Sequence, residues 1–124
     1  MVDCGPADLA EFAVHQALGH NRAGWWECDL ADNSLTWTSG VYDIFGLPQA
    51  AAVTRSEVVS LYYEDSRAAL ERLRSYSIAH RRGFVLDAQI RPVSGDVRRW
   101  MRILAAPVCE QGHSVRLHGL KLWL

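Results

Sequence analysis

The segment Gly-Trp-Trp-Glu-Cys-Asp-Leu at residues 24–30 places two tryptophans side by side. Neighbouring side chains on a β-strand point to opposite faces of the sheet. If this segment is a strand, Trp25 and Trp26 cannot share a face, so each face presents a large apolar ring. The sequence therefore predicts a sheet that is covered on both sides.

The order of the predicted elements indicates an α+β fold. Helical spacing is found over 8–18, 41–45, 54–61 and 64–79, and strand patterns over 24–30, 34–38, 84–90, 97–108 and 114–123. Two groups of hairpin-connected strands flank a helical segment without β-α-β alternation, which favours an antiparallel sheet. Thr54 and Glu57 have capping-box spacing, which predicts a helix start.

The longest predicted helix, 64–79, carries one stripe that is expected to face the core. Helical spacing assigns to that stripe Ala69, Leu70, Leu73, Tyr76 and Ser77. Arg72 and Arg74 are expected to lie away from it.

Composition limits the class of protein. The 124 residues carry a formal net charge of -1, which gives no electrostatic case for nucleic acid or for direct contact with an anionic membrane. Three widely spaced cysteines do not make a disulfide framework and are expected to be buried or idle thiols. With no long apolar run and no signal-peptide pattern, we expect a cytoplasmic location, although a soluble part of a larger membrane protein would look the same.

The titratable residues do not form a catalytic or metal-binding pattern. The five histidines are scattered over helix, turn and strand without metal-ligand spacing. Glu27 and Asp29 share one face of a strand, and alternation places them with Trp25 on the outside. We therefore expect no metal site and no enzymatic activity in this chain.

Four segments in order resemble PAS domains, and among them the PAS fold 3 group. These segments are GWWECDLADNSLTWTSGVYDIFGLP, LYYEDSRAAL, FVLDAQIRPVSGDVRRWMRILAAPV and HSVRLHGLKLWL, and together they span about residues 23–120. The sequence departs from the family pattern at Tyr62-Tyr63, where the family often has His-Pro.

The resemblance implies a five-stranded antiparallel sheet in the order 2-1-5-4-3, with short helices on one face. It divides the chain into a flanking amphipathic helix, residues 1–22, and a PAS domain, residues 23–124. By analogy Trp26 and Cys28 point inward and Trp25 outward, and alternation extends this assignment to the other strands.

A small apolar cavity between the sheet and the helices is the expected ligand site. Its expected lining is Trp26, Trp37, Phe45, Leu61, Leu73, Phe84, Leu86, Met101 and Lys121. The alternative is that these side chains simply fill a core. If Lys121 faces inward, its buried ammonium requires a partner, which a carboxylate-bearing ligand could supply.

The sequence predicts no cofactor, and it is compatible with a small ligand of unknown identity. Flavin-binding relatives that form a thiol adduct need a cysteine near residues 55–61, and the segment RSEVVSL has none. Haem-binding relatives place a histidine on the long helix, where only His80 lies near, at its far end.

The outer face of the sheet is predicted to form a homodimer with the N-terminal helix. The residues expected there are Leu9, Phe12, Ala13, Leu18, Trp25, Trp100, Leu104, Leu120 and Leu122. The alternative is a monomer whose helix folds back on its own sheet. The resemblance implies a sensor module joined to an output domain of histidine kinase or diguanylate cyclase type; the alternative is a dimerisation module with a filled core.

Overall fold

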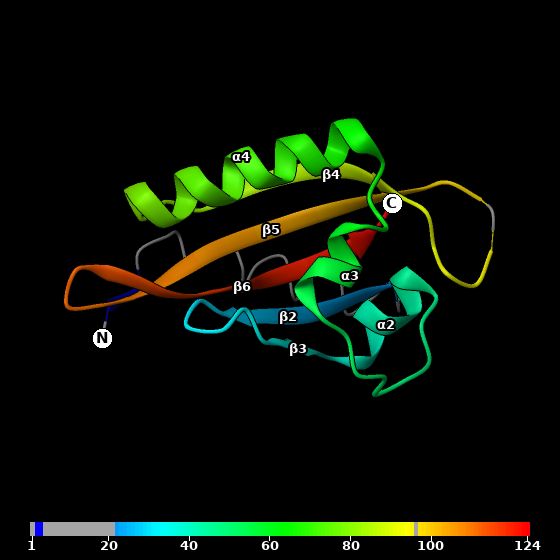
Figure 1. Ribbon diagram of the computed structural model, residues 1–124, viewed down its shortest axis with the longest axis horizontal. Helices are drawn as coiled ribbons and strands as arrows, with labels where there is room; N and C mark the ends of the chain where they lie inside the picture. The colour runs from blue at the N-terminus through cyan, green and yellow to red at the C-terminus, as the bar shows by residue number, and fades with distance from the viewer. Residues whose placement is uncertain (1, 4–21, 96) are drawn as a thin grey trace.

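A computed structural model describes residues 2–3, 22–95 and 97–124 (Figure 1). The strands are β1 (Val2–Asp3), β2 (Ala23–Asp29), β3 (Leu35–Trp37), β4 (Phe84–Ile90), β5 (Arg99–Glu110) and β6 (His113–Trp123). The helices are α2 (Ser39–Phe45), α3 (Arg55–Val59) and α4 (Glu64–His80). The predicted helix over 8–18 lies outside the described residues.

The strands form one antiparallel sheet. Its order β3-β2-β6-β5-β4 confirms the predicted order 2-1-5-4-3. The two-residue strand β1 pairs with the far end of β5, where Val2 lies opposite Cys109, and adds a strand that was not predicted. The central strand β6 pairs with both β2 and β5, so it connects the two hairpins.

The turns and caps explain where the elements begin and end. The β2–β3 turn places Asn33 in the left-handed region at φ 60°, and the Asp32 carboxylate accepts a hydrogen bond from the Ser34 amide. The predicted capping box of α3 is confirmed, because Thr54 and Glu57 bond reciprocally. In the described part of the chain, no helix is both long and apolar enough to cross a membrane.

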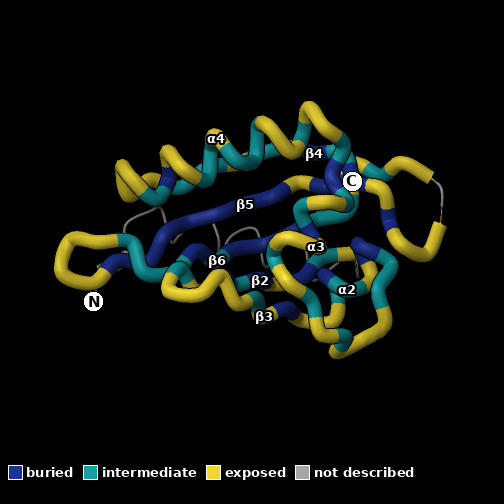
Figure 2. Tube along the Cα trace, in the orientation of Figure 1, coloured by how far each residue is buried: buried dark blue, intermediate teal, exposed yellow. Residues whose placement is uncertain are grey.

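The helices cover one face of the sheet and enclose the main core against it. Figure 1 shows α4 running along β4 and β5, with α3 in front of the sheet and α2 beside β2. Figure 2 shows β5 buried along most of its length, while the outer surface of α4 is exposed. The buried core residues include Trp26, Cys28, Trp37, Val41, Ile44, Phe45, Ile90, Met101, Ile103 and Leu117.

The face that α4 turns to the sheet differs from the predicted one. Leu70 and Ile78 pack against the core and Ser77 is buried, whereas Tyr76 is 54% exposed. The expected place of Tyr76 in the inner stripe is therefore wrong. The inward-facing residues Leu70, Ser77 and Ile78 lie on one side of the helix, which leaves Tyr76 on the outer side. There the centroid of its ring lies 4.3 Å from that of His80.

The cysteines do not all behave as predicted. Cys28 is buried with a free thiol, whereas Cys109 is disulfide-bonded. The expectation of an idle thiol is therefore wrong for Cys109. A cytoplasmic location stays a prediction.

Candidate ligand-binding site

Lys121 lies on the helix-covered face of β6 and is 7% exposed. Strand alternation predicted this inward orientation, and the structure confirms it. The irregularity in the β5–β6 ladder lies between Val108 and Cys109, near the hairpin turn, so it does not change the side to which Lys121 points.

Aromatic rings surround the Lys121 amine. The distances from Nζ to the ring centroids are 5.0 Å for Phe45, 5.4 Å for Trp26, 5.8 Å for Trp37 and 5.9 Å for Tyr62. Nζ also donates a hydrogen bond to the Tyr62 hydroxyl at 3.3 Å. Ring faces within about 6 Å attract a cation, so this enclosure offsets part of the cost of burying the ammonium.

The charge state of Lys121 is set by its burial. Desolvation lowers the pKa of Lys121 to about 7; Cys28 opposes this shift and the positive charge of Arg55 adds to it. Burial also raises the pKa of Tyr62, so its hydroxyl stays protonated. Among the described residues, no carboxylate forms an ion pair with Lys121.

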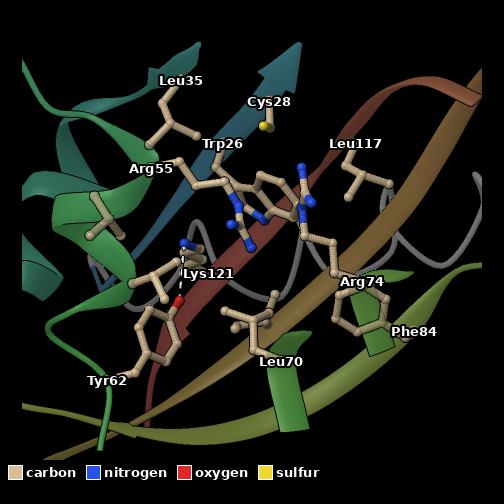
Figure 3. A pocket seen from close by; sticks show the side chains of 13 residues that line it. Trp26, Cys28, Leu35, Arg55, Tyr62, Leu70, Arg74, Phe84, Leu117 and Lys121 are labelled. Carbon is tan, nitrogen blue, oxygen red and sulfur yellow. Dashed lines mark hydrogen bonds between the residues drawn. The ribbon is translucent and has the colours of Figure 1, made fainter. Parts of the chain in front are cut away.

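Lys121 borders a partly open cavity of about 50 Å³ between the sheet and helices α3 and α4 (Figure 3). The lining residues are Trp26, Cys28, Leu35, Arg55, Val58, Val59, Tyr62, Leu70, Arg74, Phe84, Ile103, Leu117 and Lys121. Because one water molecule needs roughly 10–15 Å³ of cavity volume, this cavity fits a group of a few heavy atoms. Pockets for drug-sized ligands are several times larger, at about 300–1,000 Å³.

Two guanidinium groups lie at the same cavity. Arg55 comes from α3 and forms an ion pair with Glu71 of α4. Arg74 comes from α4 and donates a hydrogen bond of 2.7 Å to the Asn33 side chain. In Figure 3 the Arg55 guanidinium lies toward Lys121, whereas the Arg74 side chain rises beside the Trp26 ring on the side away from Lys121.

The polar atoms around the cavity are mostly hydrogen-bond donors. The indole Nε1 of Trp26 is buried and has no hydrogen-bond partner, and the same is true of Nε1 of Trp37 nearby. No Asp or Glu is among the described residues that line the cavity. A set of cations and N–H donors without a carboxylate suits a small anion.

Comparison with solved structures shows which architecture this is. The chain aligns with the N-terminal domain of a diguanylate cyclase with PAS/PAC sensor from Marinobacter aquaeolei at a TM-score of 0.72 and 13% identity, covering 82% of this chain and 94% of that one. The fold is that of a PAS domain.

Two further structures share this PAS fold. A sensory box histidine kinase/response regulator from Burkholderia thailandensis E264 aligns at a TM-score of 0.72 and 18% identity, covering 90% of this chain and 83% of that one. An RNA-binding light-oxygen-voltage receptor aligns at 0.72 and 15% identity over 83% of this chain, which spans 29% of that receptor. By sequence, no family model and no curated protein matches the chain.

The PAS cavity contains part of the predicted lining. Trp26, Phe84 and Lys121 line it. Trp37, Phe45 and Met101 are buried in the core beside it. Leu61 and Leu86 are half-buried against that core, and Leu73 is half-buried on α4. Alternation identified the inward face of the PAS sheet but not which part of the interior is hollow.

Apart from Lys121, the polar members of the site were not predicted from the sequence. Arg74 was expected away from the core, yet its side chain reaches the cavity, since a long aliphatic stem can cross an apolar surface. Arg55 lies inside the recognised capping box, and Tyr62 stands where the PAS pattern often has His. The departure at Tyr62 was the available signal.

An open groove adjoins the PAS cavity on the outside. It lies between the β2–β3 turn and α3, with a volume of about 820 Å³. Leu35, Arg55 and Val59 line both the groove and the cavity. The Arg55 side chain therefore lies between the interior and the solvent.

The other face of the PAS sheet carries a row of apolar side chains. The strand register aligns Trp25, Leu120, Leu104 and Val85 across β2, β6, β5 and β4. Leu104 and Leu120 are buried together with the partly buried Leu122.

Two tryptophans on this outer face remain accessible in the single chain. Trp25 is 36% exposed and Trp100 is 50% exposed. The expected partners of this face, Leu9, Phe12, Ala13 and Leu18, lie outside the described residues. The single chain thus leaves the predicted dimer face partly open.

Proposed function

We propose that this chain is the sensor and interaction module of a signal-transduction protein, and that it detects a small anion in the cavity beside Lys121. In this proposal residues 1–22 are the flanking segment and residues 23–124 the sensing PAS domain. The output domain is of the histidine kinase or diguanylate cyclase type, in line with the proteins that share the fold. A cytoplasmic location is part of this proposal.

One observation carries the proposal. A lysine is buried beside a small apolar cavity without a carboxylate partner among the described residues. Burying an unpaired ammonium is costly, and a bound anion removes much of that cost. A ligand carboxylate would also accept a hydrogen bond from the unpartnered indole N–H of Trp26.

The proposed response is a shift between two packings of the domain. A ligand can shift such an equilibrium only if it binds one packing better than the other. The Arg55–Glu71 pair joins α3 to α4 at the cavity, so an anion that competes with Glu71 for Arg55 favours a different arrangement of these helices.

Native mass spectrometry of the protein freshly isolated from cell extract tests the proposal. We expect a retained small anion that is lost in Lys121→Met and kept in Val85→Ala, a matched control on the opposite face of the sheet. The proposal fails if the wild-type chain retains no molecule and short carboxylates such as acetate and propionate do not raise its melting temperature.

The exposed tryptophans favour a second candidate function, a homodimerisation module without a ligand. Trp25 and Trp100 leave large apolar surface accessible, as interfaces do. The small volume of the cavity also fits this candidate. The same mass spectra separate the two functions, because a ligand-free dimer supports the module and a ligand-bound species supports the sensor.

A further inference from the structure

Lys121 is the single lysine of the chain, against twelve arginines. Arginine stays protonated at any physiological pH, whereas a buried lysine can lose its proton and become a nucleophile. The chain therefore holds its one side-chain amine in the interior, beside the cavity, and no amine side chain elsewhere. All of its other permanently charged basic residues are arginines.

We propose that Lys121 is a covalent attachment site, at which its amine forms a reversible Schiff base with a small 2-oxo acid held in the cavity. This inference deepens the proposed function and rests on the cavity being a ligand site. The ligand class combines a carbonyl carbon for the amine with a carboxylate for the surrounding cations.

The reaction balances without an oxidant or reductant. The Nζ lone pair attacks the carbonyl carbon, and a C–N bond forms while the carbonyl oxygen takes up a proton. The carbinolamine then loses that oxygen as water, and both amine protons leave with it to give the neutral imine. The Tyr62 hydroxyl, 3.3 Å from Nζ, is placed to pass these protons, since burial keeps it protonated.

The surroundings favour both the amine and its product. With a pKa of about 7, Lys121 is neutral in a large share of molecules at physiological pH, whereas a solvated lysine is almost fully protonated. A protonated imine would occupy the place of the ammonium, among the same four rings.

The carboxylate of the ligand has donors within the same cavity. The Trp26 indole N–H is buried without a partner, and Arg55 and Arg74 line the cavity from two helices. The volume of about 50 Å³ limits the acid to two or three carbons, as in glyoxylate or pyruvate. A longer chain would have to extend past Arg55 into the outer groove.

Reductive trapping tests the inference. The purified chain is incubated with glyoxylate and sodium cyanoborohydride, and the product is analysed by intact mass and peptide mapping. We expect one added carboxymethyl group on Lys121, and its yield should rise with pH around 7. Lys121→Met should lose this adduct and keep only the labelling of the α-amino group, which peptide mapping distinguishes from a modified Lys121.

A second arm tests recognition of the carboxylate. Arg74→Gln should reduce trapping of glyoxylate several-fold while leaving trapping of acetaldehyde within about two-fold, and Arg72→Gln, on the exposed side of α4, should change neither. Equal loss for both carbonyl compounds would overturn the assignment to 2-oxo acids.

The outcome also separates this inference from the proposed function. Absence of an adduct on Lys121, or a yield that rises only near pH 10, overturns the Schiff base. If the chain nevertheless retains a small anion in native mass spectra, the sensor proposal stands without it. Both are overturned if there is no adduct, no retained anion and no rise in melting temperature with acetate or propionate.

Discussion

The Lys121 amine donates a hydrogen bond to the Tyr62 hydroxyl at 3.3 Å, across 59 positions of sequence. This bond connects β6 to the segment between α3 and α4. The backbone of that segment is attached to the sheet as well, because Tyr62 forms a bridge with Ile90 and the Tyr63 amide bonds to the Gln89 carbonyl. The site thus joins the central strand to the edge of the helical layer.

Replacing Lys121 by methionine should stabilise the fold at neutral pH. The substitution removes a desolvated charge and keeps an unbranched apolar stem in the same space. Exchanging buried charges for apolar groups of similar size gains about 1–4 kcal/mol in known cases, and we expect a gain in that range. Urea unfolding at pH 7 measures it, and a loss of stability would show that Lys121 has a favourable partner.

The same variant should flatten the pH dependence of stability. The pKa of Lys121 is about 7 in the folded chain against 10.5 when solvated. Between these pH values the unfolded chain binds more protons, so the wild-type free energy of unfolding rises with pH. The difference in unfolding free energy between wild type and Lys121→Met should shrink from pH 7 to pH 10. A constant difference would contradict the lowered pKa.

Tyr62→Phe should destabilise the wild type by roughly 1–3 kcal/mol, because it removes the hydroxyl that accepts the Lys121 hydrogen bond. In the Lys121→Met background the same change should cost little, since the hydroxyl has lost this donor. A double-mutant cycle from urea unfolding gives the coupling between the two residues. Equal costs in both backgrounds would show that the pair is not coupled.

Trp25→Ser combined with Trp100→Ser should weaken a homodimer at least ten-fold. Both side chains lie on the outer face with large exposed area, and truncating aromatic anchors at an interface commonly costs about 2 kcal/mol or more. Sedimentation velocity over a concentration series measures the dissociation constant. Tyr76→Ser, 54% exposed on α4, is the matched control. A monomeric wild type would remove the dimer from the proposal.

Gly119→Ala should lower the free energy of unfolding by about 1–3 kcal/mol or more. A Cβ at this position would lie 1.8 Å from the Leu104 carbonyl oxygen, so β5 and β6 would have to separate. Gly95→Ala, where an added Cβ meets nothing within 4 Å, should stay within about 0.5 kcal/mol. Comparable effects of the two substitutions in urea unfolding would contradict the close approach.

Local patterns in the sequence predicted the five main strands, whereas the strand order and the choice of the inward face came from the resemblance to PAS domains. With Trp26 placed inward by the resemblance to PAS domains, strand alternation placed Lys121 inward, and the spacing of Thr54 and Glu57 located the start of α3. Each of these depends on residues a few positions apart.

The polar residues around Lys121 could not be predicted in this way. The contact of Tyr62 with Lys121 depends on the path of the chain after α3. Arg74 reaches the cavity because the inward face of α4 is shifted by about one residue from the predicted stripe. An arginine among apolar positions gives no sign of whether its head group lies in water or at a cavity. The hollow itself arises where side chains from strands and helices far apart in the sequence fail to fill the space between them, which no local pattern encodes.

Strand β6 has Lys121 on one side and, immediately before and after it, Leu120 and Leu122 on the other. One stretch of backbone is thus the floor of the cavity and also part of the outer apolar surface. Any occupant that tilts or displaces this stretch from within moves the two leucines by a similar amount, because they are bonded to the same peptide units. A change in the cavity can then reach the outer apolar surface directly through the backbone of a single strand.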